Sequence, residues 1–173
     1  MSDYKVSYLR IRRRVEELLV GLDTPPVDVF AIARGLGAEI RALDLESDVS
    51  GILYRDGGRK VIVVNAAHSK VRQRFTVSHE IGHLMLHKGD AVHVDEGFRI
   101  NLRDPRAATA EDVEEIEANA FAANLLMPAD WLKADLGGET LDLQDEVEID
   151  RLAGRYGVSS QAIIFRLTSL FRA

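Results

Sequence analysis

One stretch of thirteen residues, from Phe75 to His87, constrains the fold more than any other part of the chain. It reads F-T-V-S-H-E-I-G-H-L-M-L-H, so apolar residues surround a helix that also carries three histidines and a glutamate. Imidazoles and a carboxylate in a buried helix are costly unless a partner satisfies them. The stretch therefore predicts a buried helix around a polar site, running from an N-cap at Ser69 to about Lys88, where Gly89 can end it.

Within this helix, His79 to His83 form the motif H-E-x-x-H. The spacing puts both imidazoles on one helix face, where they can bind one metal ion. Glu80 can then lie beside a metal-bound water and act as general base. The alternative interpretation is a pair of core histidines bonded to backbone carbonyls. Because the chain has no cysteine, thiolate ligands and disulfides are excluded, and the expected cofactor is Zn²⁺, with Mn²⁺ or Fe²⁺ as alternatives.

A catalytic zinc usually has three protein ligands and keeps one position for water. Leu86 and Gly89 stand where the extended metzincin motif requires glycine and histidine, so that class of metallopeptidase is excluded. His87 follows His83 by one turn and is expected to support the ligands without binding the ion. His93 is a weak candidate ligand. A carboxylate from a second helix is the favoured third ligand.

The segment from Glu114 to Pro128 supplies that second helix. Glu115 and Asn119 are four residues apart and share a stripe, so Glu115 is expected to bind the metal and Asn119 to steady a histidine. Glu117 is the rival ligand, but it is turned by about 200° from Glu115 at 3.6 residues per turn. Only one of the two glutamates is expected to face the histidines. The alternative is that these acids only favour the helix N-terminus.

The rest of the chain predicts an α+β fold in which helices pack a small antiparallel sheet. Helices are expected at 8–20 and 27–36, a strand at 39–45, and a hairpin of strands 51–54 and 61–64 around a turn at 55–58. Residues 90–108 are expected to form a surface loop, followed by a helix that is capped at Thr109 and ends at Met127. Residues 143–173 predict a helix, a turn at Gly157, a cap at Ser159 and a second helix, the pattern of a helix-turn-helix.

The net charge of the chain limits the kinds of molecule that it can bind. The 173 residues include 22 basic and 28 acidic side chains, for a net charge of -6 and a pI near 5.4. This composition argues against a broad nucleic-acid surface, so direct nucleic-acid binding is not expected. The N-terminus has no uninterrupted apolar run, so neither a signal peptide nor a membrane span is expected, and the expected location is the cytoplasm. The sequence does not indicate an oligomeric state.

Two segments resemble the ImmA/IrrE family of bacterial metallo-endopeptidases: Arg72 to His83, and Glu115 to Ala122 with the later Met127-Pro128. Pro26-Val27-Asp28 and the hairpin end Val64-Asn65 are also similar to that family. The resemblance implies His79, His83 and Glu115 as metal ligands and Glu80 as general base. It also implies a zincin-like metallopeptidase domain at 1–142, with the helix-turn-helix-like tail at 143–173 packed on it as one compact unit.

Members of that family cleave repressors of the helix-turn-helix type and so relieve repression of stress-response or mobile-element genes. The resemblance therefore implies an intracellular endopeptidase that regulates transcription. The alternative is a non-catalytic, metal-stabilised module that binds protein or DNA, but such a module does not need Glu80. The substrate is expected to add to an exposed strand, Val61 to Asn65. The oxyanion stabiliser stays open among four residues, Tyr54, Arg72, His87 and His93.

Overall fold

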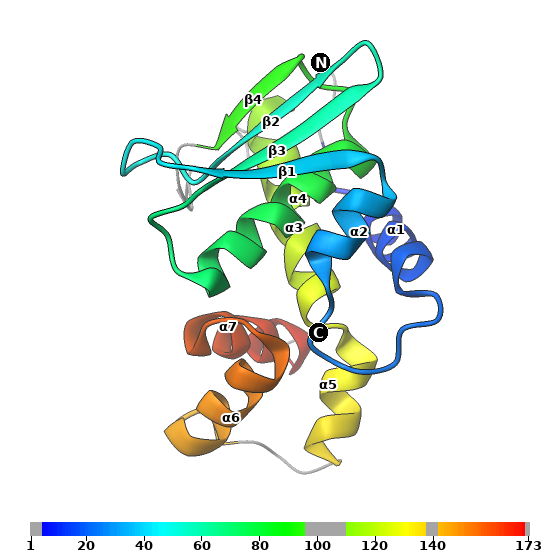
Figure 1. Ribbon diagram of the computed structural model, residues 1–173. Coiled ribbons are helices and arrows are strands. Elements are labelled where there is room, and N and C mark those ends of the chain that lie inside the picture. Colours follow the sequence, from blue (N-terminus) through cyan, green and yellow to red (C-terminus); the bar gives the residue numbers. More distant parts are fainter. Residues whose placement is uncertain (1–4, 96–109, 138–141, 172–173) are drawn as a thin grey trace.

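The computed structural model describes residues 5–95, 110–137 and 142–171 of the chain. In these residues the fold is α+β, with a four-stranded mixed sheet and seven helices (Figure 1). The elements in chain order are α1 (Tyr8–Leu19), α2 (Val29–Gly35), β1 (Ala38–Leu43), β2 (Gly51–Asp56), β3 (Arg59–Asn65), α3 (Lys70–Leu86), β4 (Val92–Asp95), α4 (Ala110–Leu126), α5 (Ala129–Leu136), α6 (Glu146–Tyr156) and α7 (Ser160–Phe171).

The strands lie in the order β1-β3-β2-β4. Strand β2 pairs antiparallel with both β3 and β4, but β1 pairs parallel with β3. The expectation of a purely antiparallel sheet was therefore wrong. The reason is that β1 joins the outer side of the β2–β3 hairpin, next to the strand that runs in its own direction. Pairing of this kind depends on a crossover through the rest of the fold, so local sequence does not fix it.

The predicted hairpin is confirmed, with a tighter turn. Both strands extend further than expected, and the connection shortens to Gly57 and Gly58. These glycines have φ values of +54° and +85°. A two-residue loop with positive φ at both positions matches the twist of the flanking strands, and glycine adopts that conformation without strain.

Strand β3 cannot accept a substrate as an added strand. Its two neighbours in the sheet are β1 and β2, so both edges of its backbone are already paired. The expectation that a peptide adds to Val61–Asn65 was therefore wrong. Within the described residues, the edges of the sheet are β1 and β4.

Strand β4 lies in the segment that was expected to be a surface loop. Four residues, Val92 to Asp95, pair antiparallel with Gly51 to Tyr54 of β2. A strand this short carries little periodicity, so it cannot be told from a loop by its residues alone. The expected cap at Thr109 lies outside the described residues.

Helix α3 begins at the expected cap, where Ser69 Oγ accepts a hydrogen bond from the Arg72 amide at 3.3 Å. It ends at Leu86, earlier than expected, and His87 follows in extended conformation. Arg55 of β2 donates to the carbonyl oxygens of His83 and His87 at 3.0 and 2.9 Å. The His83 carbonyl also accepts from the His87 amide at 3.1 Å, and His87 itself lies beyond the helix, so Arg55, far away in sequence, holds the chain in place where α3 ends.

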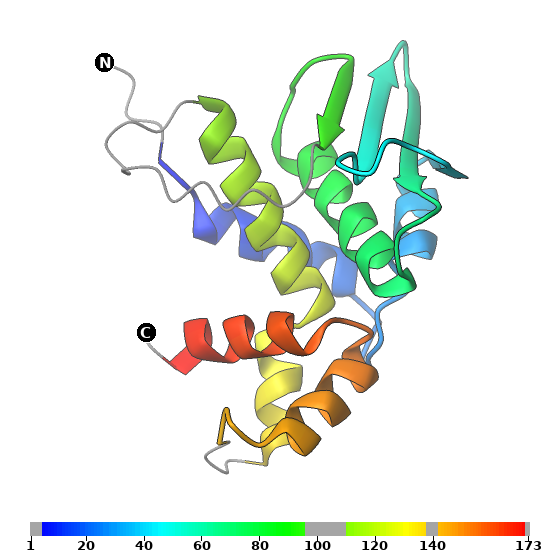
Figure 2. The same cartoon turned by 90° about the vertical axis from the view of Figure 1, so that its left-hand side faces the viewer.

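Helix α3 packs against β2 and β3 of the sheet and against α4, which in turn contacts α1 (Figure 2). The two central helices approach closely at Gly82. A Cβ atom added there would lie 3.0 Å from Ala118 Cα and 3.2 Å from Phe121 Cβ, tighter than most real contacts. Glycine at this position therefore allows α4 to bring its polar residues to the histidines of α3.

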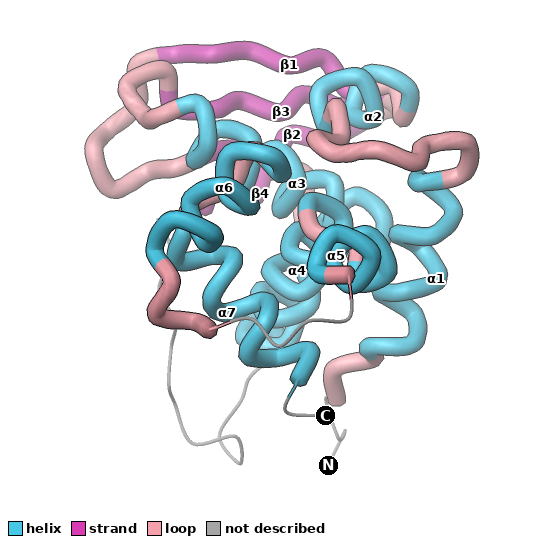
Figure 3. The backbone as a smooth tube through the Cα atoms, turned by 90° about the horizontal axis from the view of Figure 1, so that it is seen from below, coloured by secondary structure: helices cyan, strands magenta, loops and turns pink. Residues whose placement is uncertain are grey.

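Helices α5, α6 and α7 lie together at the end of the molecule away from the sheet, nearest the viewer in Figure 3. Helix α5 was not expected from the sequence. The predicted turn at Gly157 and the cap at Ser159 are both present, and Ser159 Oγ accepts from the Ala162 amide at 3.2 Å. Leu152 and Ile163 belong to the same buried core as residues of α3 and α4. The helices of the described residues include none long and apolar enough to cross a bilayer.

Candidate metal centre

Every residue from Thr76 to His83 is buried, including His79, Glu80 and His83. Ile81 and Val77 of the same helix lie in the hydrophobic core. Three ionisable side chains thus lie where water cannot solvate them. Their contacts with α4 and β4 decide what this site can bind.

The imidazoles of His79 and His83 point at each other, with their Nε2 atoms 3.0 Å apart. Glu115 of α4 reaches the same place. Its carboxylate oxygens lie 3.4 Å from His79 Nε2 and 3.1 Å from His83 Nε2. The structure therefore brings together the three side chains for which metal binding was expected.

Contacts behind the two imidazoles set their tautomers. Asn119 Oδ1 lies 2.9 Å from His79 Nδ1 and accepts a hydrogen bond from it, which leaves the Nε2 lone pair facing the cluster. His83 Nδ1 lies 3.1 Å from His87 Nδ1, and His87 Nε2 lies 3.0 Å from the Glu117 carboxylate. Because the carboxylate accepts from His87 Nε2, His87 Nδ1 accepts from His83 Nδ1. His83 Nε2 is then also free to bind a cation.

Glu117 was expected to face away from the histidines, and this was wrong. Its side chain is buried and accepts hydrogen bonds from the Ser7 amide at 2.8 Å, from Arg10 and from His87. Glu115 and Glu117 contact different histidines because His87 lies beyond the end of α3 and turns toward the side that faces α1. The N-terminal segment is thereby linked to the metal centre through Glu117 and His87.

His93 of β4 also joins the cluster. Its Nε2 lies 3.3 Å from Glu115 Oε1, and its ring centroid lies 4.1 Å from that of His83. Four side chains each place a ligand atom within 4.8 Å of the others: His79, His83, His93 and Glu115. Sequence reasoning ranked His93 low because it treated this segment as a loop. The alternation V-H-V-D is the one local hint of a strand there.

The carboxylate of Glu80 is fully buried, and neither of its oxygens has a hydrogen-bond partner among the described residues. Burial, with smaller contributions from Asp95 and Glu115, raises the pKa of Glu80 to about 8. Gly51 of β2 lies next to it, and a Cβ at that position would meet Thr76 Cγ2 at 2.4 Å and the Val63 carbonyl oxygen at 3.0 Å, so glycine lets the strand pass close to the helix that carries Glu80. The side chain is thus a base near neutrality with unused capacity for hydrogen bonds.

The charges of the cluster require a compensating positive charge. Although burial opposes it, contacts with Glu115 and Glu80 raise the pKa of His79 to about 9, whereas burial lowers the pKa of His83 to about 3. Burial alone would raise the pKa of Glu115, but its contacts with His79 and His83 lower it well below its ordinary value. A divalent cation among these atoms would supply the positive charge that a proton on His79 supplies otherwise. The donor set of imidazole nitrogens and a carboxylate suits Zn²⁺.

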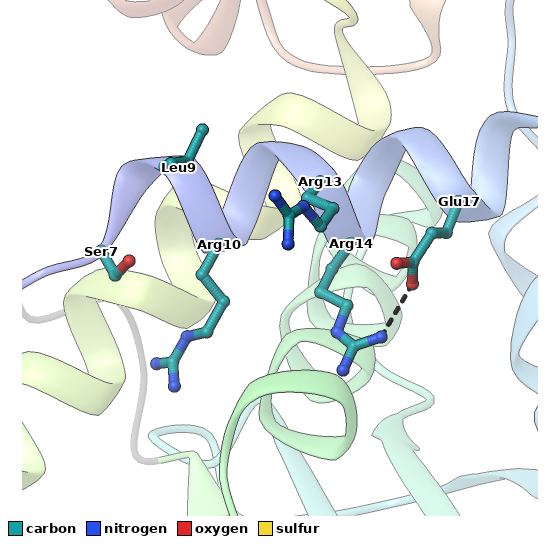
Figure 4. Close-up of a pocket in the computed structure, with 6 residues that line it drawn as sticks. All are labelled: Ser7, Leu9, Arg10, Arg13, Arg14 and Glu17. Carbon is teal, nitrogen blue, oxygen red and sulfur yellow. Dashed lines mark hydrogen bonds and ion pairs between the residues drawn. The ribbon is translucent and has the colours of Figure 1, made fainter.

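A separate pocket of about 330 Å³ lies beside α1 (Figure 4). Six residues line it: Ser7, Leu9, Arg10, Arg13, Arg14 and Glu17. Arg14 bonds Glu17 at 2.9 Å, and both side chains are about half exposed. Arg14 and Glu17 are therefore solvated charges that pair with each other. Among the described residues, no buried polar atom without a hydrogen-bond partner lines this pocket, in contrast to the metal centre.

A helix with H-E-x-x-H that packs between a mixed sheet and a second helix bearing an acidic ligand is typical of metallopeptidase domains. The chain belongs to the IrrE N-terminal-like domain family (Peptidase_M78), whose sequence profile matches residues 33–168. Two curated proteins are similar to this chain. An uncharacterized immunity region protein 2 of Bacillus phage phi105 is 27% identical over 80% of each chain. The radiation response metalloprotease IrrE of Deinococcus radiodurans is 32% identical over 62% of this chain.

The match covers 34% of the length of the deinococcal protein, so this chain is similar to only about a third of that relative. Among solved structures, a Mycobacterium tuberculosis transcriptional regulator has a similar fold, with a TM-score of 0.61 and 16% identity. The similarity covers 95% of this chain and 57% of that one. At this identity the likeness concerns the fold alone.

Proposed function

We propose that this chain is a metal-dependent endopeptidase in which His79, His83 and Glu115 hold a divalent cation, preferably Zn²⁺, and Glu80 is the general base. The observation that carries the proposal is the pair of buried Glu80 oxygens, which have no hydrogen-bond partner in the part of the chain that the structure describes, beside two imidazoles whose lone pairs converge. Burying an unsatisfied carboxylate is costly, and a purely structural metal site has no use for it. Membership of the family supports the same activity.

In this mechanism Glu80 accepts a proton from the attacking water on one carboxylate oxygen and passes it to the nitrogen of the leaving amine. Its raised pKa suits both steps near neutral pH. Asn119 and His87 hold the two ligating imidazoles in one tautomer and orientation. When bound, the cation would lower the pKa of the water and polarise the scissile carbonyl.

The proposed substrate is a repressor of the helix-turn-helix type, bound as an extended peptide, so the enzyme would regulate transcription in the cytoplasm without contacting DNA. The names of the two relatives, an immunity region protein and a radiation response metalloprotease, are compatible with a regulatory substrate. Strand β4 is a sheet edge and carries His93 beside Glu115. A peptide that pairs with this edge would therefore pass close to the metal centre.

The proposed organisation of the chain is a metallopeptidase domain at 1–142 and a helix-turn-helix-like tail at 143–173.

One observation favours the alternative, a metal-stabilised regulatory module without catalysis. With His93 the cluster offers four protein donors, and structural zinc sites usually have four. The two functions differ in what they require of Glu80. Only the enzyme needs its proton transfer.

The test is Glu80→Gln in the full chain, with Glu16→Gln on the exposed face of α1 as matched control. The variant should bind metal with the stoichiometry of the parent but cleave a candidate repressor about 10²- to 10⁴-fold more slowly, because general-base catalysis contributes that much. Repressors encoded beside this protein's own gene are the first substrates to try. Loss of metal in parallel with activity would show that Glu80 is a ligand or a structural residue, contrary to the proposal.

A further inference from the structure

Three donors are enough for a catalytic metal site, yet the structure brings four together. His93 comes from β4, whereas the other three come from α3 and α4. Its Nε2 is buried and has no hydrogen-bond partner among the described residues, although it lies 3.3 Å from Glu115 Oε1. A buried imidazole whose nitrogen lies in a cluster of ligand atoms without a hydrogen bond requires an explanation.

The separations of the donors match a closed coordination shell. Ligands about 2.0 to 2.1 Å from a tetrahedral zinc lie about 3.3 to 3.4 Å from one another. The Nε2 atoms of His79 and His83 are 3.0 Å apart, and Glu115 oxygens lie 3.4, 3.1 and 3.3 Å from the Nε2 atoms of His79, His83 and His93. A residue that only stabilised an oxyanion would lie about 3 Å beyond the ligand shell, on the far side of the reacting oxygen. His93 Nε2 instead contacts Glu115 directly, and a ring nitrogen of His93 lies within 4.8 Å of a ligand atom of both other histidines.

We infer that His93 is a fourth, displaceable metal ligand, which closes the site while no substrate is bound. The inference rests on the proposed function, because hydrolysis requires an open position for water and His93 takes it. Strand β4 can release the ligand more easily than a central strand could. It has four residues, and in the described part of the chain its backbone pairs with β2 alone. Val92 and Val94 on either side of His93 are 52% and 43% exposed.

In this arrangement the substrate both pairs with β4 and opens the coordination position at the metal. A peptide that adds to the free edge of β4 shifts the strand, and the shift withdraws His93 from the cluster and opens the position that water needs. The rate of hydrolysis would then depend on binding along the strand, so short peptides that cannot pair with β4 would be poor substrates even when they contain the scissile bond. Remote binding energy would be used to assemble the catalytic site.

The test compares His93→Ala and His93→Gln with Val94→Ala, which weakens the same strand without touching the cluster. Each full-length variant is titrated with Zn²⁺, and the Co²⁺-loaded forms are compared by visible absorption. Removing a ligand should weaken Zn²⁺ binding by about tenfold or more. It should also weaken the intense bands of four-coordinate cobalt, as a water enters the shell. Val94→Ala should keep the parent's affinity and spectrum.

Unchanged Zn²⁺ affinity and an unchanged cobalt spectrum in both His93 variants would overturn the inference. A lower rate of hydrolysis with that result would assign His93 to the oxyanion instead. The parallel variant His79→Ala separates this outcome from failure of the proposed function. If His79→Ala loses the metal while the His93 variants keep it, the site exists and only the fourth ligand is refuted. If His79→Ala also keeps the metal, the proposed centre itself is wrong.

Discussion

The metal centre between α3 and α4 and the junction of these helices with the C-terminal helices both enclose charged side chains, fully in the case of Glu80 at the metal centre and in part at the junction, but they satisfy them differently. At the junction, Arg74 donates to the carbonyl oxygens of Val27 and Gly157, both at 3.0 Å, and to that of Tyr156 at 3.4 Å. Arg166 of α7 donates in the same way to Met127 O at 3.0 Å. Each guanidinium joins backbone segments that are distant in sequence.

At the metal centre, by contrast, polar atoms remain without partners. The Glu80 oxygens accept no hydrogen bond from described residues, and the Nε2 atoms of His79 and His83 face each other. The difference shows how to tell a structural polar group from a functional one inside a protein. A structural group has used its donors and acceptors, whereas a functional group keeps some of them directed at a common point. The following changes test this distinction, from the largest expected effect to the smallest.

His79→Ala should have the largest effect, because it removes a lone pair on which the proposed site depends. A metal present at 1,000 times its dissociation constant stabilises the folded state by about 4 kcal/mol. Adding a chelator should therefore lower the melting temperature of the metal-loaded parent but leave that of the variant unchanged. The melting curves are recorded by circular dichroism. Identical curves for the parent with and without chelator, after metal analysis has shown it to be loaded, would contradict a site that links α3 to α4.

Glu115→Gln and Glu117→Gln separate a ligand from a supporting residue. Loss of the anionic oxygen of Glu115 should weaken metal binding about 100-fold, whereas Glu117→Gln should stay within about tenfold of the parent, since it acts through His87. Metal titrations of both variants at one pH measure the difference. A larger loss in Glu117→Gln would mean that the contact with His87 and Arg10 controls the site more than the carboxylate of Glu115 does.

Arg74→Met tests the structural region. It removes the donor from three partly buried carbonyl oxygens and should lower the free energy of unfolding by about 1 to 3 kcal/mol, while the metal dissociation constant stays the same. Arg151→Met, an exposed change on α6, is the matched control and should alter stability little. Urea unfolding of the metal-loaded proteins provides the measurement. Altered metal affinity in Arg74→Met would show that the two regions are not independent.

Asp135→Asn should have the smallest effect, with a distinct pH dependence. Burial alone would raise the pKa of Asp135, but hydrogen bonds from Arg155 and Tyr156 lower it. A carboxyl group with a lowered native pKa contributes stability above its unfolded pKa, near about 4, and loses it as the pH falls through the native pKa. The variant should therefore be less stable than the parent by about 1 kcal/mol at pH 7, and the difference should disappear in acid. Urea unfolding across this pH range measures it, and a difference that grew as pH fell would contradict the assigned contacts.

Helical spacing accounts for what could be predicted from sequence. His79 and His83 share a face because they are four residues apart on one helix, and the same rule puts Glu115 and Asn119 on one stripe of α4. The structure brings the two pairs together, with Asn119 on His79 and Glu115 between both histidines. Relations within one regular element follow from its period alone.

Contacts between different helices and strands could not be predicted from the sequence. His93 reaches the cluster through a short strand whose register on β2 is set by the sheet, and Arg55 caps α3 from across the same hairpin. Glu117 was expected to point away because it is turned by about 200° from Glu115 around α4, but its partners include Arg10 of α1 and His87 beyond the end of α3. The parallel pairing of β1 has the same origin. Each depends on the placement of segments that are far apart in the chain.

The close approach of α3 and α4 also bears on how proteins of this kind should be searched for and designed. The letters x in H-E-x-x-H are usually read as free, but the second of them here is Gly82, which lies against the backbone of Ala118. Alanine at that position would require α4 to give way by a few tenths of an ångström, and a bulky side chain would wedge the helices apart. The gap would carry Glu115 away from the histidines. A sequence pattern that demands a small residue at this position would therefore reject candidates that have the right ligands but no means of bringing them together.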